Sequence, residues 1–189
     1  MELENYEQKF DGLDFSEQQF RDYAFEQCEF LNCNFAKASF CDALFENCTF
    51  DNCNLVNINL SNCKWQAVTF KNSKISGLDL QPMSKMLLEF SFENCALGYS
   101  NFQGLKIPNT PFLNCEIKEC DFIGTDLRQS DFSGSNLFAS NFNQCDLQKS
   151  NFTTALNYRF DPNSNKVKGA RFSSPEVLNF LEPLGIVVE

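Results

Sequence analysis

From Phe10 to Leu80 the chain reads FDGLDFSEQQFRDYAFEQCEFLNCNFAKASFCDALFENCTFDNCNLVNINLSNCKWQAVTFKNSKISGLDL. An apolar residue, most often phenylalanine, occupies every fifth position of this stretch, and the same spacing returns from Phe92 to Phe152. A period of five matches neither the 3.6-residue period of a helix nor the two-residue period of a flat strand. The chain must therefore turn once in every repeat, which indicates a repeat architecture.

The residues around each apolar position predict its local structure. The position two before it is mostly small or apolar, as at Cys28 and Ala38, and a spacing of two places both side chains on one face of an extended segment. The position two after it is often Asn, Gly or Asp, as at Gly12 and Asn32, and these residues tolerate left-handed or turn geometry. Each repeat is therefore expected to form a short strand with two inward side chains, followed by a corner.

Several repeats combine a small residue, a polar residue and a central Phe or Leu. Examples are Cys120-Asp121-Phe122, Ser130-Asp131-Phe132, Ser135-Asn136-Leu137 and Cys145-Asp146-Leu147. From about Phe10 to Phe172 this pattern resembles the pentapeptide-repeat family. The resemblance implies an all-β fold, a right-handed quadrilateral parallel β-helix with four pentapeptides to a coil and the central residues stacked inside. About seven coils at roughly 4.8 Å each would give a rod about 34 Å long.

The interruptions of the repeat predict the domain organisation. Residues 1–172 are expected to form one β-helix, with a joint at residues 81–91, where the spacing slips, and a loop at residues 157–166. The joint either fills the gap between two stacks or serves as a recognition loop, because loops on a rigid scaffold collect partner contacts. It lies roughly where some members of the Qnr group carry a protruding loop. The recognition residues would be Pro82, Met83, Lys85 and Met86.

Residues 173–189 are expected to form a C-terminal cap. Ser174, Pro175 and Glu176 have the features of a helix start, and the apolar residues after them predict a short α-helix. A short strand at residues 186–188 would follow, and both elements would cover the last coil. Their apolar surface exceeds what one cap needs, so we expect a homodimer through this end. By resemblance, the dimer contact would comprise Val177, Leu178, Phe180, Leu181, Leu184, Ile186 and Val188.

The ten cysteines predict packing rather than chemistry. All except Cys41 stand at the inward position, where a thiol behaves as a small apolar side chain. Free buried thiols are favoured over disulfides between coils and over a metal site. With no histidine and no phosphate-binding, zinc or calcium motif, the sequence predicts neither an enzyme nor a cofactor or metal site.

The net charge of −10 argues against direct binding to nucleic acid, which needs a basic surface. The N-terminus has no signal-peptide pattern and no apolar run is long enough for a membrane span, so a soluble cytoplasmic protein is expected. Most of the charge lies in the first quarter of the chain. Its acids form either a solvated surface that blunts edge pairing or an anionic surface for a basic partner. The candidate partner-binding acids are Asp11, Asp14, Glu17, Asp22, Glu26, Glu29, Asp42, Glu46 and Asp51.

The C-terminal Leu184-Gly185-Ile186-Val187-Val188 narrows the resemblance to the Qnr, MfpA and McbG group. The resemblance implies a dimeric rod that imitates duplex DNA, binds DNA gyrase or topoisomerase IV, and protects it from quinolones or toxins. Duplex DNA would carry about 20 charges over 34 Å, about twice the charge of this chain. The alternative is a structural interaction scaffold without DNA mimicry. Mimicry predicts a continuous acidic stripe, whereas a scaffold predicts an apolar or mixed patch, such as one around Leu113 and Phe138.

Overall fold

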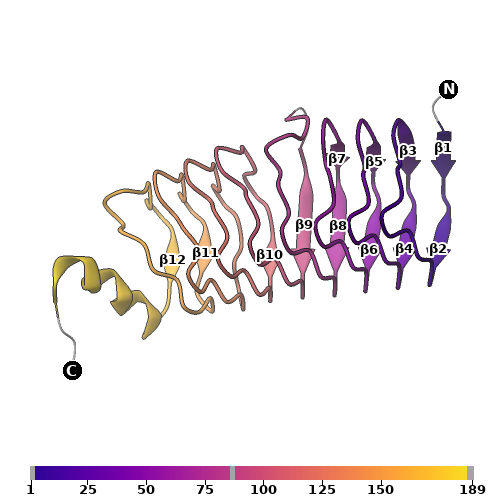
Figure 1. Ribbon diagram of the computed structural model, residues 1–189. Coiled ribbons are helices and arrows are strands. Elements are labelled where there is room, and N and C mark those ends of the chain that lie inside the picture. The colour runs from indigo at the N-terminus through magenta and orange to yellow at the C-terminus, as the bar shows by residue number, and fades with distance from the viewer. Residues whose placement is uncertain (1–2, 86–87, 187–189) are drawn as a thin grey trace.

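The computed structural model describes residues 3–85 and 88–186. It confirms the right-handed, four-sided parallel β-helix that the repeat predicts, and the two chain ends lie at opposite ends of the rod (Figure 1). Residues on successive coils pair in parallel twenty positions apart, as Asn34 does with Asp14. Each coil thus contains four pentapeptides, and each pentapeptide lies on one side of the rod.

We name the four sides A to D in the order in which the chain visits them. Side A carries a six-stranded sheet of β2 (Lys9–Asp11), β4 (Glu29–Leu31), β6 (Thr49–Asp51), β8 (Val68–Lys71), β9 (Phe90–Glu93) and β10 (Phe112–Leu113), and later the pair β11 (Asn151–Phe152) and β12 (Arg171–Phe172). Side D carries β1 (Leu3–Tyr6), β3 (Tyr23–Glu26), β5 (Leu44–Glu46) and β7 (Lys64–Gln66). Sides B and C are built from single parallel bridges, beginning with Asp14↔Asn34 on side B and Gln19↔Ser39 on side C.

The core is a set of stacked side chains along the axis of the rod. The ring of Phe30 stacks between Phe10 and Phe50, with centroids 5.0 Å and 4.6 Å away. The inward position two before each ring is also buried, as at Cys48 and Ser130. These buried polar atoms are satisfied by the backbone, since the Cys48 thiol donates to the Phe25 carbonyl at 3.2 Å. The described inward side chains therefore fill the axis of the rod.

The corners adopt left-handed geometry at many more residue types than Asn, Gly and Asp. Lys37 has φ of 58° and Ala67 has φ of 52°. Such residues ordinarily avoid this region, because the Cβ approaches the following carbonyl oxygen. A turn hydrogen bond, such as Ala38 N–H to Phe35 O at 2.9 Å, and the bonds to the adjacent coil hold them there. The stacking of the coils therefore holds the corner residues in left-handed geometry, including residue types that disfavour it.

The joint at residues 81–91 adds two residues to one coil, so that Ser91 pairs with Thr69 across twenty-two positions. Ser84 N–H still donates to Cys63 O, and Glu89 N–H donates to Trp65 O, both at 3.0 Å. The extra residues therefore lie between Ser84 and Glu89. Met83 is only 4% exposed and fills the core, so the recognition hypothesis does not hold for it. Of the other candidates, Pro82 and Lys85 are exposed, and Met86 lies outside the described residues.

In the loop at residues 157–166, the core is filled by residues that do not stand at the expected fifth positions. Tyr158 and Phe160 are buried and supply the aromatic rings that the in-phase residues Asn157 and Pro162 cannot. Asn165 takes the place of an inward Cys or Ser, and its Oδ1 accepts the Cys145 N–H at 2.9 Å. The core thus continues through a segment in which the sequence pattern fades.

The C-terminal helix η1 (Glu176–Leu184) is a 3₁₀-helix, so the prediction of an α-helix was wrong in helix type. Leu178 N–H donates to Pro175 O at 2.9 Å, three residues back, and Pro183 has no N–H to give an α-helical bond in the last turn. Phe180 packs on the rings of Phe160 and Phe172, each 4.9 Å away, which confirms that η1 covers the last coil. Ile186 is not in a strand, and residues 187–189 lie outside the described residues.

All ten cysteines are free. The nine at the inward position are buried, as the spacing predicted, whereas Cys41 is half-buried. Within the described ranges no group of His, Cys, Asp or Glu side chains could hold a metal ion. No helix of residues 3–85 or 88–186 has the length and hydropathy of a membrane span.

Candidate functional site

The nine candidate acids do not gather on one side of the rod. Side A carries Asp11, Glu29 and Asp51, side B carries Asp14 and Glu17, side C carries Asp22 and Asp42, and side D carries Glu26 and Glu46. They form a belt around the first three coils. A continuous acidic stripe along the rod therefore cannot come from these residues alone.

Among the described residues, lysine and arginine partners form ion pairs with acids on all four sides, two each on sides A, B and D and one on side C. Ion pairs join Lys9 to Glu29 and Lys71 to Glu93 on side A, Lys37 to Glu17 and Lys118 to Glu116 on side B, and Arg128 to Asp126 and Lys166 to Asp146 on side D. Exposed pairs of this kind contribute little to stability, but they cancel charge locally. Sides A, B and D consequently present a mixed surface to a partner.

Side C has a different charge pattern. Its outward acids are Asp22, Asp42, Asp79 and Asp121, which lie on the first, second, fourth and sixth coils. Arg21 is its one cation among the described coils up to residue 144, and it pairs with Asp42 at 3.1 Å. From Ser39 to Gln144 the pentapeptides of this side contain no Lys or Arg. Of the four side C carboxylates, Asp42 is thus paired with Arg21, and Asp22, Asp79 and Asp121 have no ion pair among the described residues.

Neutral amides hold the side C carboxylates in place. Asn62 Nδ2 donates to Asp42 Oδ1 at 2.8 Å, and Asn101 Nδ2 donates to Asp79 Oδ1 at 3.2 Å, in each case from the following coil. Gln81 N–H also donates to Asp79 Oδ1 at 3.1 Å. Hydrogen bonds from neutral donors orient the carboxylates and preserve their charge. Two of the four side C carboxylates, those of Asp42 and Asp79, are therefore fixed in orientation.

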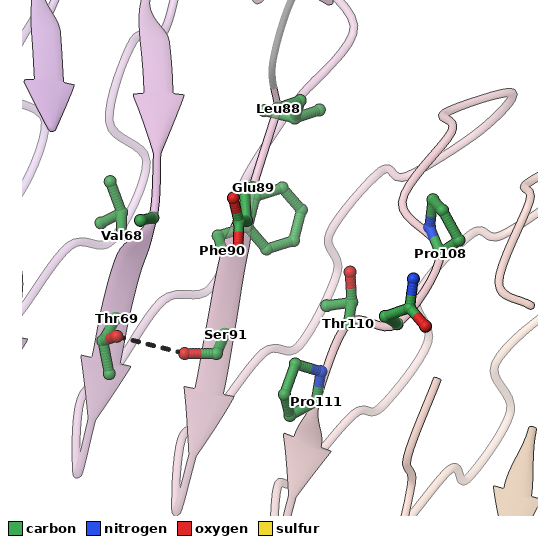
Figure 2. Close-up of a pocket in the computed structure, with 11 residues that line it drawn as sticks. Val68, Thr69, Leu88, Glu89, Phe90, Ser91, Pro108, Thr110 and Pro111 are labelled. Atoms are coloured by element: carbon green, nitrogen blue, oxygen red, sulfur yellow. Dashed lines mark hydrogen bonds between the residues drawn. The ribbon is translucent and has the colours of Figure 1, made fainter. Parts of the chain in front are cut away.

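A hollow of about 510 Å³ lies at the corner between sides D and A, beside the joint (Figure 2). Val68 and Phe90 line it on one flank, and Pro108 and Pro111 line it on the other. It arises where the longer coil departs from its neighbours. The slip at residues 81–91 was visible in the sequence, but its proximity in space to Pro108 and Pro111 was not.

The polar groups that line the hollow, as far as the structure describes them, bond mainly with their neighbours. Ser91 Oγ donates to Thr69 Oγ1 at 3.3 Å, and Thr110 Oγ1 donates to the Ile107 carbonyl at 2.8 Å. Glu89 is the one ionisable side chain among the described residues that line it. The hydroxyls therefore bond with their neighbours, and no nucleophile is paired with a base.

The residues proposed for the dimer contact have different surroundings. Leu178 is 41% exposed and Ile186 is 50% exposed, whereas Val177 and Leu181 are half-buried. Phe180 packs on its own last coil and is used by the cap. The side chain of Leu184 and all of Val188 lie outside the described residues. Leu178 and Ile186 are thus the exposed members of the set.

A family model for the pentapeptide repeat region matches residues 7–80, 45–122 and 83–152. Full-length QnrB1, a plasmid-mediated fluoroquinolone resistance protein, shares 18% identity and a TM-score of 0.59, with 97% of this chain and 100% of that chain covered. HetL from the cyanobacterium Nostoc, a pentapeptide repeat protein involved in heterocyst differentiation regulation, shares 11% identity and a TM-score of 0.71, with coverage of 90% and 86%. No curated protein sequence matches significantly. At these identities the structural likeness establishes the fold.

Proposed function

Because this chain belongs to the pentapeptide-repeat family, we propose that it is a non-enzymatic, protein-binding rod that docks through side C on a type II topoisomerase, DNA gyrase or topoisomerase IV. The observation that carries the proposal is the row of side C carboxylates, which has no Lys or Arg from Ser39 to Gln144. The partner surface is then basic, like the surface with which such an enzyme holds DNA.

The fold of QnrB1, a fluoroquinolone resistance protein, supports the choice of partner. Side C does not reproduce the charge of DNA, which would present about 20 phosphates over 34 Å. The proposed rod therefore covers part of a basic surface and relies on its rigid shape for the remaining contact. Its place of action would be the cytoplasm, where the enzyme works.

The test is a supercoiling assay with purified gyrase and a decatenation assay with topoisomerase IV, each with and without a fluoroquinolone. Micromolar protein should restore the activity of the enzyme in the presence of the drug, or inhibit the enzyme in its absence. The triple variant Asp22→Asn, Asp79→Asn and Asp121→Asn should lose at least tenfold in potency. No effect of the unmodified protein on either enzyme would remove the topoisomerase proposal.

A matched triple variant on side A controls for total charge. Asp11→Asn, Asp51→Asn and Asp131→Asn remove the same three charges from a different side of the rod. This control should keep its potency within about twofold. Equal losses in the two triple variants would show that net charge, rather than side C, determines binding.

The second candidate is an interaction scaffold without DNA mimicry, favoured by exposed apolar residues on side B. Phe138 is 55% exposed and Leu156, on the next coil, is 49% exposed. Leu113, which the sequence suggested for the same patch, is half-buried on side A instead. A Phe138→Ser variant with full activity in the supercoiling assay would separate this surface from the topoisomerase contact.

We also propose that two copies associate through the C-terminal end. Leu178 and Ile186 expose apolar surface there, beside the cap. Light scattering should give the mass of a dimer, and Leu178→Glu with Ile186→Glu should give a monomer. Tyr99→Glu, which changes a 68% exposed residue on a middle coil, should leave the dimer intact.

A further inference from the structure

The two ends of the β-helix are finished differently. At the C-terminal end η1 covers the last coil, and Phe180 packs on Phe160 and Phe172. At the N-terminal end Phe10 and Phe15 are half-buried, and each stacks on one ring only, Phe30 and Phe35 respectively, at 5.0 Å. Within the described part of the chain, no ring stacks on their outer faces. Among residues 3–85 and 88–186, the aromatic stacks of Phe10 and Phe15 therefore end at the first coil.

The first coil also has a backbone edge at the N-terminal end. β2 is the edge strand of the side A sheet. On the second coil, Glu29 N–H and Asn34 N–H donate back to Gln8 O and Leu13 O, both at 2.9 Å. The equivalent amides one coil earlier belong to Lys9 and Asp14. By the same geometry, the N–H groups of these two residues point away from the second coil, into the space beyond the N-terminal end of the rod.

The orientation of the carbonyl groups at this edge also follows from comparison with the second coil. Phe15 N–H donates forward to Asn34 O at 2.7 Å, because the carbonyl at the bridge position faces the preceding coil. The carbonyls of Lys9 and Asp14 hold that position on the first coil and face outward from its end. Gln18 Nε2 donates to Asp14 O at 3.3 Å, and an added strand would replace this side-chain bond. An exposed strand edge with alternating donors and acceptors is a template for an added strand.

The charged residues along this edge indicate which kind of partner can bind there. Asp11 and Asp14 are exposed along it, whereas Glu17 pairs with Lys37 of the second coil at 3.2 Å and Lys9 lies 4.0 Å from Glu29. Two copies meeting through this end would bring these acids together, which disfavours self-association there. The C-terminal end of another copy is closed by η1. The edge is therefore complementary to a cationic segment of a different protein.

We propose that the edge formed by residues 9–17 binds an extended cationic segment of another protein as an added parallel strand. Apolar side chains of the segment would continue the stacks of Phe10 and Phe15. Its Lys or Arg side chains would lie beside Asp11 and Asp14. The inference uses the end of the rod and is independent of the docking proposed for side C.

The test uses a fluorescent ten-residue peptide, Lys-Phe-Lys-Asn-Ala-Lys-Phe-Lys-Asn-Ala, which supplies two basic repeats in the register of a preceding coil. Fluorescence anisotropy should show saturable binding at low salt. The same peptide with both Phe amides N-methylated keeps its charge but cannot donate to the carbonyls of Lys9 and Asp14. It should bind at least tenfold more weakly. No binding at 1 mM peptide, or equal binding of the two peptides, would overturn the proposal.

Two charge variants locate the site. Asp11→Asn with Asp14→Asn should weaken binding at least fivefold, whereas Glu116→Gln with Asp131→Asn, on the same two sides but several coils away, should stay within twofold. Amide NMR signals of Lys9 and Asp14 should shift on titration. Equal weakening by the two pairs, or shifts confined to other coils, would contradict the assignment. Failure here leaves the supercoiling result unaffected, since that assay reports on side C.

Discussion

The side-chain amide of Asn114 lies directly over Gly134 on the next coil, in the space that a Cβ at residue 134 would occupy. Gly134 also has φ of 73°, which a side chain disfavours. Gly104 has a similar φ of 65° but no atom within 4 Å of its would-be Cβ. The two glycines therefore separate the cost of left-handed geometry from the cost of a contact between coils.

We expect Gly104→Ala to lower the free energy of unfolding by about 1 kcal/mol through backbone geometry alone. Gly134→Ala should cost about 2–3 kcal/mol, because Asn114 must also move. Urea denaturation of both variants measures the difference. Equal losses of free energy in the two variants would show that Asn114 moves aside without an energetic cost.

Tyr158→Phe should stabilise the protein. The Tyr158 hydroxyl is the one buried side-chain N or O atom without a hydrogen-bond partner in residues 3–85 and 88–186, and burial raises the pKa of this Tyr to about 12. Removing an unsatisfied buried hydroxyl should raise the free energy of unfolding by about 1 kcal/mol. Tyr99→Phe, at a 68% exposed site, should leave the urea midpoint unchanged and serves as the control. A loss of stability in Tyr158→Phe would indicate a partner for this hydroxyl, such as an ordered water.

Cys41 should be the one thiol that reacts rapidly with a thiol reagent in the folded protein. It is half-buried on side C, whereas the other nine cysteines are buried in the core. Absorbance with Ellman's reagent should show one fast thiol under native conditions and all ten after unfolding. Cys41→Ser should abolish the fast phase. A fast phase that survives this change would show that core thiols reach solvent.

Stability should fall at alkaline pH. Burial raises the pKa of the Cys48 and Cys53 thiols to about 12, against about 8.5 in an unfolded chain. The folded protein therefore keeps both thiols protonated. The contribution of these thiols to the free energy of unfolding is complete below about pH 8.5 and is lost as pH rises toward 12. The urea midpoint should drop between pH 8 and pH 10.5. Cys48→Ala, although less stable overall, should show a smaller drop than the unmodified protein.

Much of the fold could be read from side-chain spacing. The five-residue period predicted the inward positions, and buried residues such as Phe50, Cys63 and Leu127 confirm it. The cap was predicted from Pro175 and the apolar residues after it, but its 3₁₀ geometry was not. Helix type depends on which backbone donors find acceptors in the final packing, and residue types alone leave that choice open.

The candidate site was predicted less well, for a geometric reason. The acids of residues 11–51 are close in sequence. Every four pentapeptides carry the chain around all four sides of the rod, so acids that are neighbours in sequence face different directions. Asp79 and Asp121 lie far from this segment in sequence but share side C with Asp22. The two residues added at the joint shift the later coils by two positions in the numbering, so counting in twenties no longer identifies the side.

The sequence alone determined which side chains face inward, because a five-residue repeat with two apolar positions has few other ways to bury them. Folding of the whole chain decided which carboxylates share a side, which lysines neutralise them, and that Tyr158 and Phe160 complete the core. These features depend on contacts between residues twenty or more positions apart. Such contacts exist only once the coils are stacked, and the joint at residues 81–91 sets their alignment.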